Sequence, residues 1–473
     1  MRLRLALPLL ACLTALMAFG VSPAVAQSIT PAEVSKIDQI VADSLSRTGV
    51  PSASVAIVRG GEIVFAKAYG KQSDAMAVAR IDAPYQIASV SKQFTAAALL
   101  LLEDQGKLNL DDKISAYIPG ITGGERMTIR QLLSHTSGLQ DYWPQDYSFG
   151  AMARPITPQG IVDRWAKKPL DFEPGTQWQY SNTGYVVAGM IVEKVAGMPL
   201  IDFLDVHIFK PLGMTAIDQD LAIGKGYPQG YQRFALGPVR PEKPAAHGWL
   251  FAAGELAMSA TDLAKWDIAR INRTILPTDD WITQETPVKL SDGTSNGYGL
   301  GVFAATQQGH KIIEHSGEAV GFLSENIVFP EDKAAVVVLV NADFSDAFTS
   351  IAGQISALIL SPAKAMAPDP EQAKTEHAKA VLDAMRAGTL DPKLMTENWN
   401  YYFTGTAAAD YKQSLAALGE PRSFTLARPA RLRGGFVNRN YVATYADRKL
   451  NIVTYAELGD GGRYEQFLVM PAE

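Results

Sequence analysis

Residues 89–106 read SVSKQFTAAALLLLEDQG, and this stretch decides both the fold and the chemistry that we expect. The run at 93–102 is apolar on nearly every side, which is typical of a helix buried at the centre of a domain. Gly106 follows at a position where helices often end. Ser89 and Lys92 stand three residues apart just before the run, so a helix that begins at Ser89 turns both side chains the same way.

The pairing of Ser89 with Lys92 suits nucleophilic catalysis. Serine is a poor nucleophile at its own pKa, and a lysine amine kept neutral by burial can accept its proton. Backbone N–H groups at the start of a buried helix can hold an oxyanion. The same spacing recurs at 361–364, but that copy contains a proline in a Pro/Ala-rich segment, so we set it aside. A capping serine beside a solvent-reaching lysine is the alternative for this motif taken alone.

Two further triplets favour the catalytic interpretation. Tyr180-Ser181-Asn182 is the only Tyr-x-Asn in the sequence, and it follows a turn at 173–176 that can aim a phenol and an amide into a cleft. His315-Ser316-Gly317 is the only His-x-Gly, and it ends a predicted strand. We expect its glycine to let the substrate backbone approach closely.

In this order, the three motifs resemble the serine β-lactamase and penicillin-binding superfamily, in its class C β-lactamase and D,D-carboxypeptidase branch. The stretches at 127–139, 172–175, 210–214 and 298–301 are also similar to that branch, so the resemblance covers about residues 33–360. It implies an α/β (α+β) fold of the β-lactamase/transpeptidase type. An antiparallel sheet would be flanked by helices and interrupted by a helical insertion.

The resemblance also implies roles for individual residues. Ser89 is the expected nucleophile, and Lys92 and Tyr180 are expected to share proton transfer. Asn182 is expected to bond to the acyl side chain of the substrate and to Lys92. The residues expected to bind substrate are Asn182, His315, Ser316, Gly317 and Glu318.

Two residues depart from the pattern of the superfamily. The oxyanion hole is expected to use the backbone N–H groups of Ser89 and Glu318, and the Glu318 side chain is bulkier and more acidic than expected there. The charge preference of the substrate is therefore open. His315 stands where class C β-lactamases usually carry lysine, which weakens the case for β-lactam hydrolysis.

The remaining pattern predicts one discontinuous catalytic unit and a separate tail. A capping box at 30–33 opens a helix, and two β-rich runs are joined by a Gly-Gly hairpin signal at 60–61. We divide the chain into a catalytic domain at 30–360, a Pro/Ala-rich linker at 361–370 and an accessory α+β domain at 371–473. The expected strands of the catalytic unit are 52–59, 62–69, 298–304, 311–316, 322–329 and 334–340, and a helix at 347–360 closes it.

Composition excludes several classes of protein. Of the 473 residues, 47% are hydrophobic and 19% are charged, which excludes a disordered or coiled-coil chain. The net charge is −6 without a basic stripe, so nucleic acid is not an expected partner. Six histidines and one cysteine leave little room for a zinc cluster or a disulfide framework. We expect neither a metal nor a cofactor.

Residues 1–26 predict export. Two arginines precede an apolar run, and Ala24-Val25-Ala26 forms a cleavage site for a signal peptide. We therefore expect a periplasmic or secreted bacterial protein without a stable membrane span after cleavage. A transmembrane anchor and lipidation at Cys12 are the alternatives.

The leading interpretation is an exported serine hydrolase that acts through an acyl-enzyme at Ser89. The third triplet favours a peptide or amide substrate, of the D,D-peptidase-like or D-aminopeptidase-like kind. A carboxylesterase of the same fold, a weak β-lactamase and a penicillin-binding sensor without turnover are the alternatives. The natural substrate, the oligomeric state and the role of the tail are left open.

Overall fold

The computed structural model describes residues 28–76, 78–307, 310–360, 371–427, 430–459 and 461–472. The predicted signal peptide at 1–26, with Cys12, and the predicted linker at 361–370 lie outside the described residues. Within the described ranges, none of the helices has both the length and the apolar character needed to cross a membrane.

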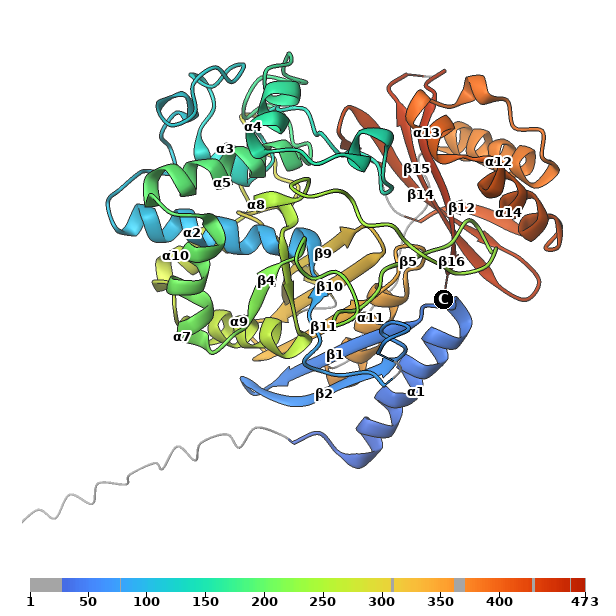
Figure 1. The fold of residues 1–473 in the computed structure, drawn as a ribbon, viewed down its shortest axis with the longest axis horizontal. Helices are drawn as coiled ribbons and strands as arrows, with labels where there is room; N and C mark the ends of the chain where they lie inside the picture. The colour runs from blue at the N-terminus through green and yellow to red at the C-terminus, as the bar shows by residue number, and fades with distance from the viewer. Residues whose placement is uncertain are drawn as a thin grey trace, which may run out of the picture.

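A six-stranded antiparallel sheet lies at the centre of the molecule, with the strand order β2-β1-β11-β10-β9-β8 (Figure 1). The predicted hairpin of β1 and β2 forms. Its first strand, β1, also pairs with β11, which is the last strand of the sheet along the sequence, with Val55 opposite Val338. The two ends of the catalytic unit therefore meet in the middle of the sheet. The strands are β1 (Ser52–Arg59), β2 (Glu62–Gly70), β8 (Phe303–Gln307), β9 (His310–Ala319), β10 (Phe322–Phe329) and β11 (Ala334–Val340).

Strand β11 explains how the sheet is covered on both faces. Successive side chains of a strand point to opposite faces. Val336 and Val338 pack with helices α1 (Pro31–Thr48) and α11 (Ala347–Ile359), whereas Val337 belongs to the apolar cluster of the helical insertion. An unbroken apolar run is therefore the pattern that this central strand requires.

The helical insertion places Ser89 against the sheet. Helix α2 (Lys92–Asp104) is buried along most of its length and packs against α5 (Asn182–Ala196). We expected the helix to begin at Ser89, but Ser89 lies in a short 3-10 turn at Ala88–Ser91 and the α-helix begins at Lys92. Ser89 and Lys92 still face each other, because the tighter turn also aligns residues three apart.

The expected strand at 298–304 is only partly present. Strand β8 begins at Phe303, and Tyr298 makes a single bridge to Phe303. The two glycines of this stretch are needed for close approach. A Cβ on Gly299 would lie 2.2 Å from the Gln284 carbonyl oxygen, and one on Gly301 would lie 2.8 Å from that of Lys92.

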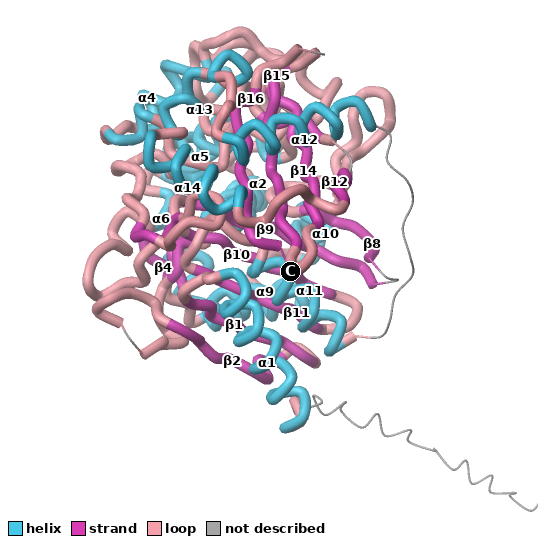
Figure 2. Tube along the Cα trace, turned by 90° about the vertical axis from the view of Figure 1, so that its right-hand side faces the viewer, coloured by secondary structure: helices cyan, strands magenta, loops and turns pink. Residues whose placement is uncertain are grey.

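The tail forms its own sheet, and none of its described strands joins the central sheet. Figure 1 shows the tail beside the catalytic unit, and Figure 2 shows β14 and β15 above the end of the central sheet that carries β8 and β9. The apolar core of the tail also contains Tyr147 and Ala235, so the two units share buried surface. The tail elements are α12 (Gln372–Ala387), α13 (Glu397–Tyr402), α14 (Gly405–Ala416), β12 (Ser423–Leu426), β13 (Arg431–Arg433), β14 (Phe436–Thr444), β15 (Lys449–Glu457) and β16 (Tyr464–Ala472).

Candidate active site

Three hydrogen-bonding contacts hold the Lys92 amine beside Ser89. Its Nζ lies 2.9 Å from Ser89 Oγ, 2.8 Å from Asn182 Oδ1 and 2.7 Å from the Ala253 carbonyl oxygen. Lys92 is fully buried, and this burial holds the pKa of its amine well below the usual value. A neutral amine has two N–H groups and one lone pair. The two amide oxygens can only accept, so in the neutral form of the amine they take its two N–H groups and leave the lone pair for the Ser89 hydroxyl, whereas the protonated form donates to all three oxygens.

Asp141 fixes the orientation of the Asn182 amide. Asn182 Nδ2 donates to Asp141 Oδ2 at 3.3 Å, and the Asn182 backbone N–H donates to Asp141 Oδ1 at 3.1 Å. The amide oxygen is thereby turned toward Lys92. Burial raises the pKa of Asp141. Asp141 was not identified from the sequence, because it lies outside the three motifs.

The backbone around Ser89 is tightly packed. Ala88 has a φ of 47°, a left-handed conformation that costs a non-glycine residue energy and often occurs at active sites. A Cβ on Gly317 would lie 2.1 Å from the carbonyl oxygen of Ile87. The need for glycine at 317 therefore comes from the chain itself, because β9 approaches the Ile87–Ser89 turn here. This differs from the expectation that the glycine makes room for substrate.

The ring of Tyr180 lies between the side chains of Lys92 and Arg433. The centroid of its ring is 4.9 Å from Lys92 Nζ and 5.3 Å from Arg433 Cζ. Burial raises the pKa of the phenol, and its hydrogen bond with Ser89 opposes that rise. Tyr180 is therefore a neutral phenol near pH 7, which is the form that donates a proton.

A chain of hydrogen bonds links the second and third motifs. The Ser181 backbone N–H donates to His135 Nδ1 at 3.1 Å, and His135 Nε2 lies 3.2 Å from the Tyr298 hydroxyl. That hydroxyl lies 2.9 Å from His315 Nε2, and His315 Nδ1 lies 2.6 Å from the Ser316 carbonyl oxygen. A backbone N–H only donates and a carbonyl only accepts. The two ends therefore assign the same direction, with His135 Nε2 and His315 Nδ1 protonated.

His315 is neutral near pH 7, because burial lowers its pKa to about 3. The wall that β9 forms beside Ser89 thus lacks the cation that a lysine at this position would supply. Tyr298 was missed as a partner of the site, because the sequence pattern had assigned it to a strand.

One cavity of about 200 Å³ brings most of the predicted site residues together. Lys92 lies behind this cavity in contact with Ser89, and Gly317 lies against Ile87. The tail closes one side of the cavity, which the sequence did not predict. The predicted residues in its lining are Ser89, Tyr180, Asn182, His315, Ser316 and Glu318; other lining residues include Trp143, Asp146, Tyr147, Phe303, Arg431 and Arg433.

The turn between β13 and β14 carries the tail into the active site. Arg433 forms an isolated parallel bridge with Tyr180, so the tail backbone pairs with the residue expected to transfer protons. The Gly435 N–H donates to Gln179 Oε1 at 3.2 Å. A Cβ on Gly434 would lie 2.1 Å from Pro144 Cβ, so only glycine permits this approach. The signal in the sequence was Arg-Leu-Arg-Gly-Gly at 431–435, two cations before a tight turn.

Asp146 joins the catalytic unit to the tail. It accepts hydrogen bonds from Arg433 Nη1 at 2.7 Å and from Gln466 Nε2 at 2.6 Å. Burial raises the pKa of Glu318 well above the usual value, and Asp146 adds to this rise. Burial thus disfavours a negative charge on Glu318, which reduces the acidic character expected at this position.

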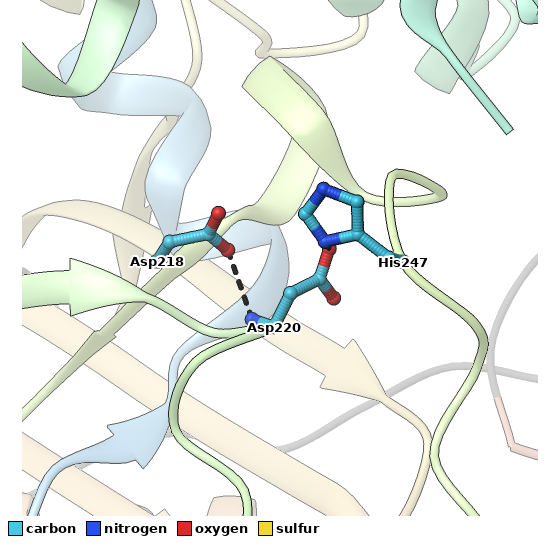
Figure 3. Close-up of side chains that lie close together, drawn as sticks. All are labelled: Asp218, Asp220 and His247. Carbon is cyan, nitrogen blue, oxygen red and sulfur yellow. Dashed lines mark hydrogen bonds and ion pairs between the residues drawn. The ribbon is translucent and has the colours of Figure 1, made fainter. Parts of the chain in front are cut away.

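A separate cluster contains a possible set of metal ligands. Asp218, Asp220 and His247 have ligand atoms within 4.8 Å of one another (Figure 3). His247 Nδ1 lies 2.7 Å from Asp220 Oδ2, which also accepts the Gly248 N–H at 2.8 Å. None of the three residues lines the Ser89 cavity. The existing hydrogen bonds account for the arrangement, so we assign it to the structure of this loop.

Comparisons with known proteins agree with this geometry. The beta-lactamase family model matches residues 37–360. Penicillin-binding protein 4* of Bacillus subtilis is 28% identical over 312 residues, which span 62% of this chain and 68% of that protein. The D-stereospecific amidohydrolase from Streptomyces sp. superposes with a TM-score of 0.60 at 27% identity, covering 70% of this chain and 99% of that one.

One solved structure also covers the tail. The octameric penicillin-binding protein homologue from Pyrococcus abyssi superposes with a TM-score of 0.61 at 22% identity. The match covers 92% of this chain and 99% of that chain, so the similarity of fold extends beyond the catalytic unit.

Proposed function

The chain belongs to the beta-lactamase family, whose relatives include serine hydrolases, and from this premise we propose that it hydrolyses a small peptide or amide through an acyl-enzyme at Ser89. The observation that carries the proposal is the three-way contact of the Lys92 amine. It leaves a lone pair for the Ser89 hydroxyl and no other described side chain in competition for it.

The proposed reaction has two stages. Ser89 Oγ attacks the carbonyl carbon while its proton passes to Lys92 Nζ, and the backbone N–H groups of Ser89 and Glu318 stabilise the oxyanion. Collapse of the tetrahedral intermediate breaks the C–N bond, and the proton reaches the leaving amine through Tyr180. Water then attacks the carbonyl carbon of the acyl-enzyme, and the ester bond to Ser89 breaks. A proton of this water returns to Ser89 Oγ through Lys92 and Tyr180, and the carboxylic acid is released.

The size and surroundings of the cavity support a small substrate. Its volume of about 200 Å³ is below the roughly 300–1,000 Å³ usual for drug-sized ligands. The D-stereospecific amidohydrolase from Streptomyces sp. has a matching fold at 27% identity. We therefore favour a short D-amino acid amide or a peptide with a D-residue at the cleaved bond. The neutral His315 makes β-lactam hydrolysis a less favoured activity.

A substrate panel tests this proposal. The purified protein is assayed with D- and L-amino acid amides, D-alanyl dipeptides, nitrophenyl esters and a chromogenic cephalosporin, beside Ser89→Ala as the blank. Ser89-dependent release of ammonia or amino acid from the D-configured amides or peptides supports the proposal. Cleavage of the esters alone indicates a carboxylesterase instead, and stable acylation by penicillin without release indicates a sensor.

The proposal also places the enzyme outside the cytoplasm, on the basis of residues 1–26. Expression of the full chain in a Gram-negative host followed by fractionation tests export. We expect the mature protein in the periplasm or the medium, with Gln27 as the first residue in its mass spectrum. Retention of residues 1–26 on the isolated protein would contradict signal-peptide cleavage.

A further inference from the structure

Three arginines line the cavity, and two of them are already occupied. Arg433 forms an ion pair with Asp146 at 2.7 Å and also donates to the Tyr455 hydroxyl at 2.8 Å. Arg233 donates from all three of its nitrogens to backbone carbonyl oxygens at 2.6–3.1 Å. Arg233 therefore has no nitrogen left for a ligand, and the charge of Arg433 is already paired with Asp146.

Arg431 differs from the other two. Its Nε donates to Asn438 Oδ1 at 2.9 Å, and Asn438 Nδ2 donates in turn to the Thr454 carbonyl oxygen at 3.0 Å. Asn438 is 1% exposed, so this anchor is a buried part of the tail sheet. Among the described residues, no carboxylate forms an ion pair with Arg431. One nitrogen thus holds the guanidinium in place, while the two terminal nitrogens have no partner.

The position of Arg431 relates it to the reacting group. Arg431 lines the same cavity as Ser89 and, together with Ser316 and Phe303, also lines the neighbouring cavity beside β9. Its charge acts on both His315 and Tyr180. Arg431 therefore borders both cavities.

We propose that Arg431 binds a carboxylate of the substrate, so that the tail selects anionic peptides or amides for reaction at Ser89. The proposal rests on the function proposed above, because it assigns a ligand group to the same cavity. A planar guanidinium with two free terminal nitrogens matches a carboxylate in a two-point hydrogen bond. Four carboxyl groups also line the cavity. Asp146 is paired with Arg433, and burial raises the pKa of Glu242 to about 8, that of Asp343 to about 7 and that of Glu318 above its usual value, which disfavours their anionic forms.

Binding of a charged and a neutral analogue tests the proposal without the need for turnover. Calorimetry compares N-acetyl-D-alanine with N-acetyl-D-alaninol, in which a neutral alcohol replaces the carboxylate and which is not a D-amino acid amide, on wild-type protein and on Arg431→Gln. We expect wild-type protein to favour the carboxylate by roughly ten- to a hundredfold, which is the usual strength of a charged hydrogen bond. Arg431→Gln should abolish this ratio, and Arg431→Lys, which keeps the charge but not the fork, should restore part of it.

The matched control is Arg448→Gln. Arg448 is a half-exposed tail arginine that pairs with its neighbour Asp447 and does not line the Ser89 cavity. This variant should keep the wild-type ratio. The ratio is taken within each protein, so a general loss of folded protein affects both ligands equally.

Several outcomes would overturn the proposal. They are equal binding of the two ligands by wild-type protein, no binding of either at millimolar concentration, and an unchanged ratio in Arg431→Gln. Labelling of Ser89 by a neutral fluorophosphonate is measured in parallel. If Ser89 is not labelled but the carboxylate is still preferred, the proposed hydrolase function is wrong and the carboxylate site stands. The two failures are therefore distinguishable.

Discussion

The two walls of the Ser89 cavity differ in origin and in charge. The sheet wall comes from β9, where burial disfavours the charged forms of both His315 and Glu318, because it lowers the pKa of the first to about 3 and raises that of the second. The tail wall comes from the turn after β13, where Arg431 and Arg433 remain charged. The catalytic unit thus holds Ser89 and Lys92, the proposed nucleophile and base, and the tail holds Arg431 and Arg433.

This difference has a physical reason. A charge inside the catalytic unit would act on the Lys92 amine at short range in a poorly screened interior. A second cation there would favour a neutral amine but would also compete for the Asn182 oxygen. On the tail, the Arg433 charge is paired with Asp146, and it also contributes to the lowered pKa of Lys92. The predictions below test each side of this comparison.

The largest effect is expected from Ser89→Ala. Removal of the nucleophile should lower kcat by several orders of magnitude on the substrate that the panel identifies. The fold should be unchanged, since alanine fits the 3-10 turn, and circular dichroism checks this. A variant that retains more than about a tenth of the wild-type kcat would show that Ser89 is not the nucleophile.

The next effect is expected from Lys92→Arg. Arginine stays protonated in proteins, so it cannot accept the Ser89 proton, and kcat should fall by about 10²–10⁴. Because burial lowers the pKa of Lys92, wild-type activity should persist at neutral pH and decline only as the pH falls through that lowered pKa. The exposed Lys71→Arg is the matched control. Near-normal kcat in Lys92→Arg would move the base role to Tyr180.

Asp146→Asn tests how firmly the tail wall is attached. This change leaves the Arg433 charge without its partner in a largely buried place, so the free energy of unfolding should fall by about 3 kcal/mol. Urea denaturation followed by tryptophan fluorescence measures the change. Asp447→Asn breaks an exposed ion pair of the same chemical type and should have no measurable effect. Equal stability of the two variants would mean that the tail is not held at Asp146.

The smallest effect, a change in the pH dependence of stability, is expected from Glu325→Gln in strand β10 of the central sheet. Burial raises the pKa of Glu325 to about 8, against about 4.5 for the unfolded chain. The folded state therefore binds an additional proton between these values, and wild-type stability should fall as the pH rises from about 5 to 8. Glutamine cannot ionise, so the variant should lack this decrease and exceed wild type in stability at pH 8 by about 1–3 kcal/mol.

Thermal unfolding at pH 5 and pH 8 measures that difference. Glu331→Gln, on the exposed turn after β10, is the control and should follow the wild-type pH dependence. A Glu325→Gln protein with the same pH dependence as wild type would show that the pKa of Glu325 is not raised in the folded protein.

Short motifs were enough to predict the central part of the site. Ser89 with Lys92 and Tyr180 with Asn182 are each encoded within four residues, and the structure brings the two pairs into contact. The hairpin at 52–69 and the strands at 322–329 and 334–340 were also predictable, because their apolar runs are bounded by strong turn signals. The roles of these residues in the reaction stay predictions.

Contacts between distant segments could not be predicted. Arg433 reaches Tyr180 across about 250 residues of sequence, and no local pattern encodes that approach. Tyr298 was predicted to lie in a strand. Instead, two flanking glycines allow its hydroxyl to lie between His135 and His315. Gly317 was correctly predicted to be a position of close approach. The group that approaches it is the Ile87 carbonyl of the same chain, whereas substrate backbone was expected.

The central claim is that Ser89 becomes acylated during turnover with the neutral Lys92 amine as the base. Acid quenching during hydrolysis of a D-amino acid amide or ester, followed by intact mass and peptide mapping, measures this directly. We predict an added mass equal to one acyl group on the peptide that contains Ser89, present in wild type and absent from Ser89→Ala. An acyl group on any other residue would contradict the account. So would a fluorophosphonate that blocks activity by modifying a site other than Ser89.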